Sequence, residues 1–234
     1  MECKTEIDDI YIYTERYNLN KELCDKIINN FNNSNYYESR TVVGLNKETR
    51  NSYQLSISIE KSLNNTWSEI DTILFNTLNN AIIKYFHVIK DRINNKFNKF
   101  FDKESIIDMT GMNIMTDFGY NILKYCKNDG FYKFHTDFIS PFNKEELSIE
   151  LRKISFIWYL NDLEEGGETE FFNGKIKPEA GKLLFFPSNF NYVHRGNMPI
   201  SDDKYIIVGW LGEKIVYHKE APPYNTQTSA DVNS

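Results

Sequence analysis

The 234-residue sequence predicts a mainly β domain with helices at its N-terminal end, an α+β fold. Up to about residue 105, apolar residues recur mostly at helical spacing. From about residue 108 the pattern changes to short apolar or alternating runs that are rich in β-branched and aromatic residues. No repeat of fixed period and no Gly/Ser or Pro linker separates the two parts. We therefore expect one domain, with helices packed on a β-sandwich or barrel.

The N-terminal part contains two amphipathic stripes, and each predicts a helix. The first stripe comprises Leu19, Leu23, Ile27, Ile28 and Phe31. The second, for which Thr66 or Ser62 would be the N-cap, comprises Trp67, Ile70, Ile73, Leu74, Leu78, Ile82 and Phe86. Both stripes need an apolar surface to cover, so residues 1–105 are interpreted as a helical support region of the same domain.

The C-terminal part is expected to supply the β core over residues 106–218. Turn signals lie at residues 128–130, 165–167, 173–174 and 187–189. The predicted strands are Asn121–Lys124, Phe131–Asp137, Ile154–Leu160, Glu168–Phe172, Lys182–Phe186 and Lys204–Leu211. Residues 219–234 show no apolar periodicity, so we expect a disordered tail.

Charge and cysteine content argue against several classes of protein. The chain has 33 acidic and 27 basic residues, a net charge of −6 and no block of Lys and Arg, which disfavours binding to duplex nucleic acid or to an anionic membrane. The longest apolar runs are too short to span a bilayer, and the first residues lack a signal-peptide pattern, so a cytoplasmic protein is expected. Three scattered cysteines fit neither a disulfide framework nor a zinc knuckle, and they suit a reducing compartment.

Two of the four histidines have neighbours that indicate a metal site. His135 and Asp137 are two residues apart in a predicted strand, so both side chains should point to the same face. His194 follows the apolar strand Leu183–Phe186 and a turn at Pro187. Two imidazoles and one carboxylate form the facial triad that holds non-haem Fe(II) and leaves open coordination positions. A His-x-Asp pair alone is weak evidence, because a lone strand histidine is more often a hydrogen-bonded core or surface residue.

Lys204 strengthens this interpretation. It lies ten residues after His194 and opens the apolar run 204–210. A cation there can enter the same pocket and bind the distal carboxylate of a dicarboxylic acid whose other end chelates the metal. The simpler alternative is a solvated lysine at the start of a strand.

Taken in order, these segments resemble the 2-oxoglutarate/Fe(II)-dependent dioxygenases, specifically the prolyl 4-hydroxylase-like catalytic domain. The resemblance covers about residues 110–212 and rests on Tyr125, Gly130, His135, Asp137, residues 152–161, 165–171 and 181–187, His194 and residues 204–210. It implies a double-stranded β-helix, a jelly-roll core whose mouth holds the iron and whose major sheet is supported by the N-terminal helices. The first hundred residues carry no motif of this family.

The resemblance also implies roles for individual residues. His135, Asp137 and His194 correspond to the iron ligands, and Lys204 to the residue that binds the C5 carboxylate of 2-oxoglutarate. Tyr125 corresponds to the tyrosine that supports that carboxylate, and Thr169 is placed to add a hydroxyl. Tyr132 and Arg152 fall where the family places residues around the substrate, and Trp210 matches the tryptophan that closes the core near the iron at the substrate side. Arg195 is unusual for an animal or plant prolyl hydroxylase, and we expect it to reach the substrate. Alternatives stay open: Thr169 as a surface threonine, Arg152 as a solvent-facing arginine and Trp210 as plain core.

The implied activity is hydroxylation of a C–H bond, foremost of a prolyl residue in a peptide or protein. Fe(II), 2-oxoglutarate and O2 would be required, succinate and CO2 released, and ascorbate would serve as reductant. Alternatives are hydroxylation of a free amino acid or other small metabolite, nucleic-acid demethylation, which would need a basic track, and a non-enzymatic cupin-like module that binds a metal or ligand. Residues 138–150 are long enough for a loop over either a peptide or a metabolite. The sequence does not predict an oligomeric state.

Overall fold

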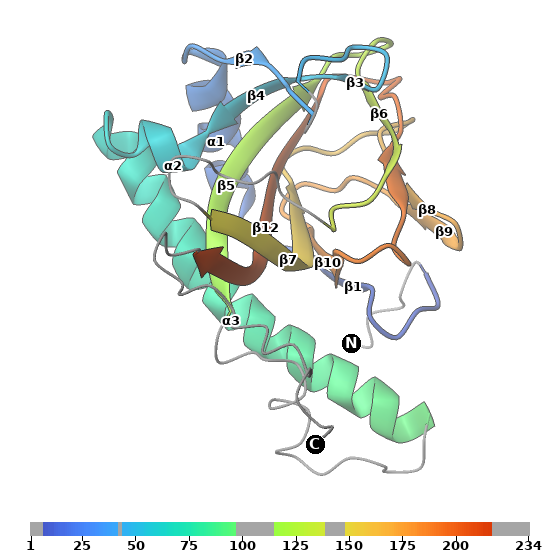
Figure 1. Ribbon diagram of the computed structural model, residues 1–234. Helices are drawn as coiled ribbons and strands as arrows, with labels where there is room; N and C mark the ends of the chain where they lie inside the picture. Colours follow the sequence, from blue (N-terminus) through green and yellow to red (C-terminus); the bar gives the residue numbers. More distant parts are fainter. Residues whose placement is uncertain (1–6, 42–43, 97–114, 139–147, 217–234) are drawn as a thin grey trace, which may run out of the picture.

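The computed structural model describes residues 7–41, 44–96, 115–138 and 148–216. Two antiparallel sheets face each other, and helices cover the outer side of the larger sheet (Figure 1). The predicted tail 219–234, most of the predicted loop 138–150 and the predicted boundary at residue 105 lie outside the described residues. No helix in the described part of the chain is both long enough and apolar enough to cross a membrane.

The two sheets have seven and five strands. The order in the larger sheet is β1-β10-β7-β12-β5-β4-β2, with β1 at Tyr13–Glu15, β2 at Tyr37–Glu38, β4 at Tyr53–Ser56, β5 at Thr116–Tyr125, β7 at Ser148–Tyr159, β10 at Leu183–Pro187 and β12 at Lys204–Val216. The order in the smaller sheet is β3-β6-β11-β8-β9, with β3 at Arg50–Asn51, β6 at Phe131–His135, β8 at Thr169–Phe171, β9 at Gly174–Ile176 and β11 at His194–Gly196. This arrangement confirms the predicted jelly-roll core.

The alternation of side chains in each strand produces two apolar layers. In β10, Leu183 and Phe185 pack against the helices, whereas Leu184 and Phe186 lie between the two sheets. The helices are α1 at Lys21–Asn32, α2 at Ile57–Glu60 and α3 at Asn65–Lys96. Their buried faces contribute to the first layer Ile27, Phe31, Trp67, Ile70, Leu74 and Leu78. The larger sheet is therefore held rigidly from behind, and its other face is available for a site between the sheets.

The N-terminal part differs from the prediction in two respects. It supplies four short strands as well as helices, and β1, β2 and β4 extend the larger sheet while β3 joins the smaller one. These strands are two to four residues long, so they have no periodicity of their own and form by pairing with longer neighbours. The N-cap prediction is also wrong, because the side chain of Asn64 accepts a hydrogen bond from the backbone N–H of Thr66 (2.8 Å), and Ser62 Oγ donates to the carbonyl of Ile59 instead.

All six predicted core strands occur, but their lengths differ. Strands β5, β7 and β12 extend well beyond the predicted ends, and the short strands β9 and β11 were not predicted. Strand β6 ends at His135, so Asp137 lies in the segment that follows the strand. The prediction that both residues occupy one strand face is therefore wrong, although the structure still brings them together.

Candidate active site

The two histidines and the aspartate meet at the mouth between the sheets. His135 is the last residue of β6, His194 is the first residue of β11, and the two are direct partners in the antiparallel register. One ligand atom from each of His135, Asp137 and His194 lies within 4.8 Å of the other two. The carboxylate oxygens of Asp137 are 3.6 Å from Nε2 of His135 and 3.8 Å from Nε2 of His194. The predicted donor set is thus assembled in space.

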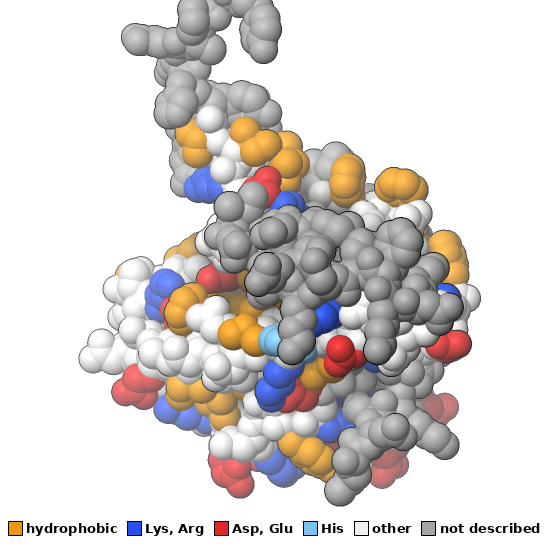
Figure 2. All heavy atoms as spheres, turned by 90° about the horizontal axis from the view of Figure 1, so that it is seen from below, with side chains coloured by type: hydrophobic (Ala, Val, Ile, Leu, Met, Phe, Trp, Pro, Cys, Tyr) orange, Lys and Arg blue, Asp and Glu red, His pale blue; other side chains and the backbone are white. Residues whose placement is uncertain are grey.

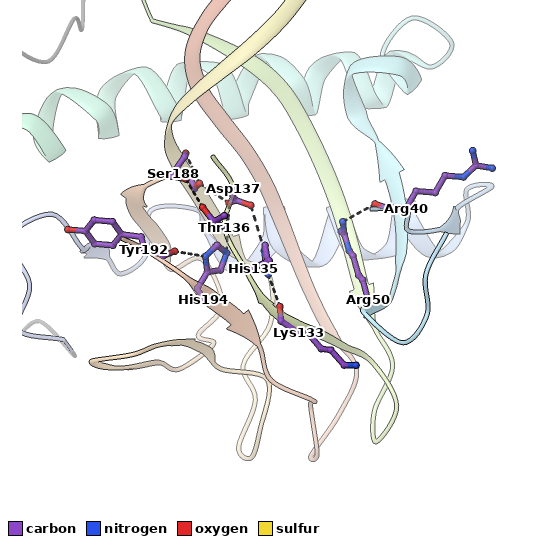
Figure 3. Close-up of polar contacts among 10 residues, drawn as sticks. Arg40, Arg50, Lys133, His135, Thr136, Asp137, Ser188, Tyr192 and His194 are labelled. Carbon is purple, nitrogen blue, oxygen red and sulfur yellow. Dashed lines mark hydrogen bonds and ion pairs between the residues drawn. The ribbon is translucent and has the colours of Figure 1, made fainter. Parts of the chain in front are cut away.

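Backbone contacts orient both imidazole rings (Figure 3). Nδ1 of His135 is 2.8 Å from the carbonyl oxygen of Lys133, and Nδ1 of His194 is 3.0 Å from that of Tyr192. Because a carbonyl can only accept, each Nδ1 carries the hydrogen and each Nε2 keeps its lone pair. Such contacts fix the tautomer and the orientation of a metal-ligating histidine.

Asp137 is also held in place. It is only 9% exposed, and its Oδ2 accepts a hydrogen bond from Ser155 Oγ at 2.8 Å. The hydroxyls of Ser155 and Ser188 lie 2.9 Å apart, so Ser188, which directly follows β10, holds Ser155 in turn. The prediction did not include Ser155, although a serine inside the apolar run 154–160 was a usable signal, because a buried hydroxyl requires a partner.

Aromatic rings surround the histidines on the protein side. The ring of Tyr132 is stacked on His135, with centroids 3.5 Å apart. The rings of Phe171 and Phe186 lie 5.6 and 4.7 Å from that of His194. On the face shown in Figure 2, histidine atoms are visible at the surface with basic and apolar side chains beside them. The two imidazoles therefore lie against an aromatic wall, and the side chain of His135 keeps 16% of its surface exposed.

The protonation states suit metal binding. Burial, and then the neighbouring His194, lowers the pKa of His135 to about 3, so its imidazole is neutral at pH 7. Burial alone would raise the pKa of Asp137, but the two histidines and the hydrogen bond from Ser155 outweigh it and lower the pKa to about 2. Imidazole nitrogens and one carboxylate are the donor set of non-haem Fe(II) sites, so the residues present fit this metal.

A cavity of ≈ 490 Å³ opens beside the donor atoms. Nine of the ten predicted site residues line it, namely His135, Asp137, His194, Tyr125, Thr169, Lys204, Tyr132, Arg195 and Trp210. Arg152 is the exception, because it lines a neighbouring hollow. The candidate residues predicted from widely separated segments are thus largely in one place.

Lys204 is buried in this cavity without an acidic partner. It is 2% exposed, and its Nζ lies 5.3 Å and 5.6 Å from the ring centres of Tyr125 and Tyr159. No carboxylate of the described residues is within ion-pairing distance of it, and burial lowers the pKa of its ammonium to about 7. The interpretation of Lys204 as a solvated edge lysine is therefore wrong. A buried cation of this kind is completed by a ligand anion.

Tyr125 and Thr169 are buried near this lysine. Tyr125 is the direct partner of Lys204 between β5 and β12, and burial raises the pKa of its hydroxyl. Thr169 is 2% exposed, so it is not a surface threonine. Tyr159 donates its hydroxyl hydrogen to Thr169 Oγ1 at 2.6 Å, so the hydroxyl hydrogen of Thr169 remains available for a ligand oxygen.

The four residues predicted on the substrate side lie around the mouth of the cavity. The guanidinium carbon of Arg152 lies 3.5 Å from the ring centre of Trp210. Arg195 is engaged with Glu170, whose Oε2 accepts from Nε at 3.1 Å and from Nη2 at 2.9 Å. Trp210 and Tyr132 line both the cavity and the neighbouring hollow, so they form the passage between the two.

The prediction missed Arg50. This residue belongs to β3, is the register partner of Tyr132, and its guanidinium carbon lies 4.9 Å from the centre of the Tyr132 ring. It lines both the cavity and the neighbouring hollow. A single arginine in a part of the chain interpreted as helical support gave no signal.

Comparisons with known proteins agree with this site. Residues 120–212 match the family model described as the 2OG-Fe(II) oxygenase superfamily. No curated protein matches the sequence. This chain is similar in structure to a prolyl hydroxylase from Trichoplax adhaerens solved with a hypoxia inducible factor peptide fragment, with a TM-score of 0.59 and 15% identity over 88% of this chain and 85% of that one.

Two further solved structures are similar. A prolyl-4-hydroxylase from Pseudomonas putida gives a TM-score of 0.53 and 15% identity over 87% of this chain and 93% of that one. A viral collagen prolyl hydroxylase from Paramecium Bursaria Chlorella virus-1 gives 0.49 and 20% identity over 87% and 96%. At these identities the two likenesses with a TM-score above 0.5 show the fold alone.

Fold, donor set and family match lead to the same conclusion. The match spans β5 to the middle of β12, which includes both histidines, the aspartate and Lys204. Enzymes of this superfamily use Fe(II), 2-oxoglutarate and O2, and the donor set and the buried cation fit the first two. Residues 120–212 therefore form a 2OG-Fe(II) oxygenase domain.

Proposed function

We propose that this protein hydroxylates a C–H bond of a prolyl residue in a peptide, with release of succinate and CO2 from 2-oxoglutarate. The observation that carries the proposal is one cavity in which two imidazoles and a carboxylate face a buried lysine that has no acidic partner. A metal at one end and a cation at the other match the two ends of 2-oxoglutarate.

His135, Asp137 and His194 would hold the iron through Nε2, a carboxylate oxygen and Nε2. The carbonyls that accept from each Nδ1 keep both rings in the ligating tautomer, and Ser155 keeps the carboxylate from rotating. Bound Fe(II), together with 2-oxoglutarate and O2, supplies the oxidising power that breaks an unactivated C–H bond. The role of these side chains is to hold three neighbouring positions and leave the others open.

Lys204, Tyr125 and Thr169 would bind the cosubstrate. Lys204 donates to the distal carboxylate, and because it is buried this ion pair is screened little by solvent. The hydroxyl hydrogen of Thr169, which Tyr159 leaves available, is a second donor for the same anion. The ring of Tyr125 forms the wall against which the ammonium lies.

The shape of the mouth supports an extended substrate. Tyr132 and Trp210 line both the cavity and a further hollow of ≈ 830 Å³, so a chain that presents one residue to the metal has space to continue. Arg195, held by Glu170, borders the cavity and would position the substrate from the smaller sheet. The Trichoplax adhaerens enzyme of the same fold was solved with a peptide fragment, which agrees with this proposal.

The test is a product assay with two readouts. The protein with Fe(II), 2-oxoglutarate and ascorbate under air should release succinate slowly by itself and faster with a proline-containing peptide that it accepts. Mass spectrometry should then find a peptide product heavier by one oxygen atom. The Zn(II)-loaded protein is the control and should do neither. Absence of succinate with and without peptides would contradict the proposal.

A further inference from the structure

A second hollow opens directly beside the metal-site cavity. It spans ≈ 830 Å³, including space open to solvent, and shares Asp137 and Trp210 with the cavity. A molecule whose reactive C–H bond lies near Asp137 can therefore extend into it. Among the described residues that line the hollow, Asp137 is the sole acidic one, and its carboxylate belongs to the metal site.

Arg152, on β7, reaches this hollow with unused hydrogen-bonding capacity. Its Nε is buried and has no hydrogen-bond partner, and no carboxylate of the described residues lies within ion-pairing distance of its guanidinium. The ring of Trp210 covers one guanidinium face at 3.5 Å. Stacking occupies the face of the group and leaves its edge, which carries the N–H donors, for a planar acceptor. The Arg152 side chain is thus held in place by stacking, while its buried Nε–H still has no acceptor.

Arg50 brings a second positive charge from the other sheet. Strand β3 belongs to the smaller sheet and β7 to the larger, so the two arginines approach the hollow from different walls. The guanidinium of Arg50 is held by Ser52 Oγ at 3.2 Å and by the carbonyl of Arg40 at 3.5 Å, and neither contact neutralises it. Arg40 also lines the hollow, but its side chain points away from the histidines (Figure 3), so the subsite is assigned to the other two arginines.

We propose that Arg152 and Arg50 form an anion subsite that binds a carboxylate of the substrate beside the C–H bond to be hydroxylated. The preferred substrate would then be a peptide with Asp or Glu next to the target residue, or a free amino acid that presents its own carboxylate. This inference rests on the proposed function, which it makes more specific. A carboxylate matches the planar donor edge of a guanidinium bidentately.

A nucleic-acid phosphate is the less favoured anion. Binding of a nucleic-acid strand needs a basic track along its backbone. The net charge of this chain is −6, and among the described residues that line the two pockets at the metal site the arginines without a carboxylate partner all border this one hollow. A single carboxylate requires no more than this.

The test measures binding without turnover, by calorimetry on Zn(II)-loaded protein saturated with 2-oxoglutarate. Two probe pairs differ only in the carboxylate: the peptides Gly-Glu-Pro-Glu-Gly and Gly-Gln-Pro-Gln-Gly, and L-proline and L-prolinamide. The first pair tests a peptide source of the anion and the second a free amino acid. A single-stranded oligodeoxynucleotide tests phosphate.

Each probe is titrated into wild type, Arg152→Gln, Arg152→Lys, Arg50→Gln and the control Arg16→Gln. Arg16 pairs with Glu179 and lines neither hollow at the metal site. In at least one pair, the carboxylate member should bind about tenfold more tightly or better to wild type and to Arg16→Gln. Arg152→Gln and Arg50→Gln should remove most of this preference, and Arg152→Lys should restore it in part, because it keeps the charge without the planar donor edge.

Intact 2-oxoglutarate binding shows that a variant is folded. The proposal of a carboxylate subsite is wrong if neither probe pair shows a preference for its carboxylate member. It is also wrong if Arg152→Gln retains the preference while still binding 2-oxoglutarate. Tighter binding of the oligonucleotide than of every carboxylate probe would likewise contradict it. Succinate release by the iron-loaded wild-type protein tests the proposed function separately. An active enzyme without a carboxylate preference would refute the subsite alone.

Discussion

Two lysines among the residues that the structure describes are almost completely buried, and they differ in what surrounds them. Lys182, next to the start of β10, is 0% exposed, pairs with Glu179 at 2.7 Å and donates to the carbonyl of Lys177 at 2.8 Å. Lys204, at the start of β12, is 2% exposed and has two aromatic rings but no acidic partner among the described residues. Burial alone therefore does not indicate function. The missing counter-charge distinguishes the lysine expected to bind a ligand.

The role given to Lys204 requires a metal that binds the other end of 2-oxoglutarate. Asp137→Ala should abolish 2-oxoglutarate turnover, because it removes the only carboxylate of the donor set. Succinate release measured with and without added Fe(II) checks this, and circular dichroism should show an intact β core. Glu164→Ala, at an exposed position away from the cavity, should keep full activity. Full activity of Asp137→Ala would show that the metal ligands are misassigned.

The next largest effect is expected at Lys204. Lys204→Ala should weaken 2-oxoglutarate binding by about 2–5 kcal/mol, because the distal carboxylate would be buried without a counter-charge. Calorimetric titration of the Zn(II)-loaded protein measures this loss. An unchanged affinity would mean that another cation, such as Arg195 at the same cavity, binds the carboxylate.

The opposite pattern is expected at Lys182. Lys182→Met should lower the free energy of unfolding by about 1–3 kcal/mol, since it removes the buried ammonium that contacts Glu179 and the carbonyl of Lys177, while Glu179 keeps its contact with Arg16. We expect a loss of stability near the lower end of this range because Glu179 is partly solvated. Urea denaturation measures it, and 2-oxoglutarate affinity should stay within a factor of two of wild type. A large loss of affinity in a folded Lys182→Met protein would remove the distinction between the two lysines.

The smallest expected effect is a pH dependence at Lys204. Burial lowers its pKa to about 7, so the ammonium is charged below that pH, and above it the ligand must bind together with a proton. Affinity for 2-oxoglutarate should therefore be highest below about pH 7 and fall by up to about tenfold per unit above it. Titrations at several pH values, in buffers of different ionisation enthalpy, measure both the affinity and the proton uptake. Lys204→Arg should bind independently of pH over this range, since a guanidinium stays charged.

The sequence was sufficient for the core of the site and insufficient for its borders. His135, His194 and Lys204 could be predicted because motifs at the right spacing and in the right order resemble one family, and pairing of β6 with β11 then brings the histidines together. Arg50 could not be predicted, because its position depends on a two-residue strand that has no pattern of its own. Asp137 lies beside both histidines, as expected, but for a reason other than the predicted one, since it follows the strand rather than lying within it.

The fold shows the same limits. The jelly roll followed from alternating runs long enough to have a period, such as those of β7 and β12. The strands β1 to β4 pair with β10, β5 and β6, and such pairing is a tertiary event that local propensity does not encode. The place of Arg152 in a neighbouring hollow likewise depends on the packing of Trp210 beneath it.

The central claim is that Lys204 binds the distal carboxylate of a cosubstrate whose other end lies at the metal. A two-by-two titration tests it most directly, with wild type and Lys204→Ala against 2-oxoglutarate and 2-oxobutyrate, which lacks that carboxylate. Wild type should prefer 2-oxoglutarate by about thirtyfold or more, and Lys204→Ala should bind the two acids with similar affinity. If Lys204→Ala keeps the full preference, the lysine does not contact that carboxylate and the account of this cavity is wrong.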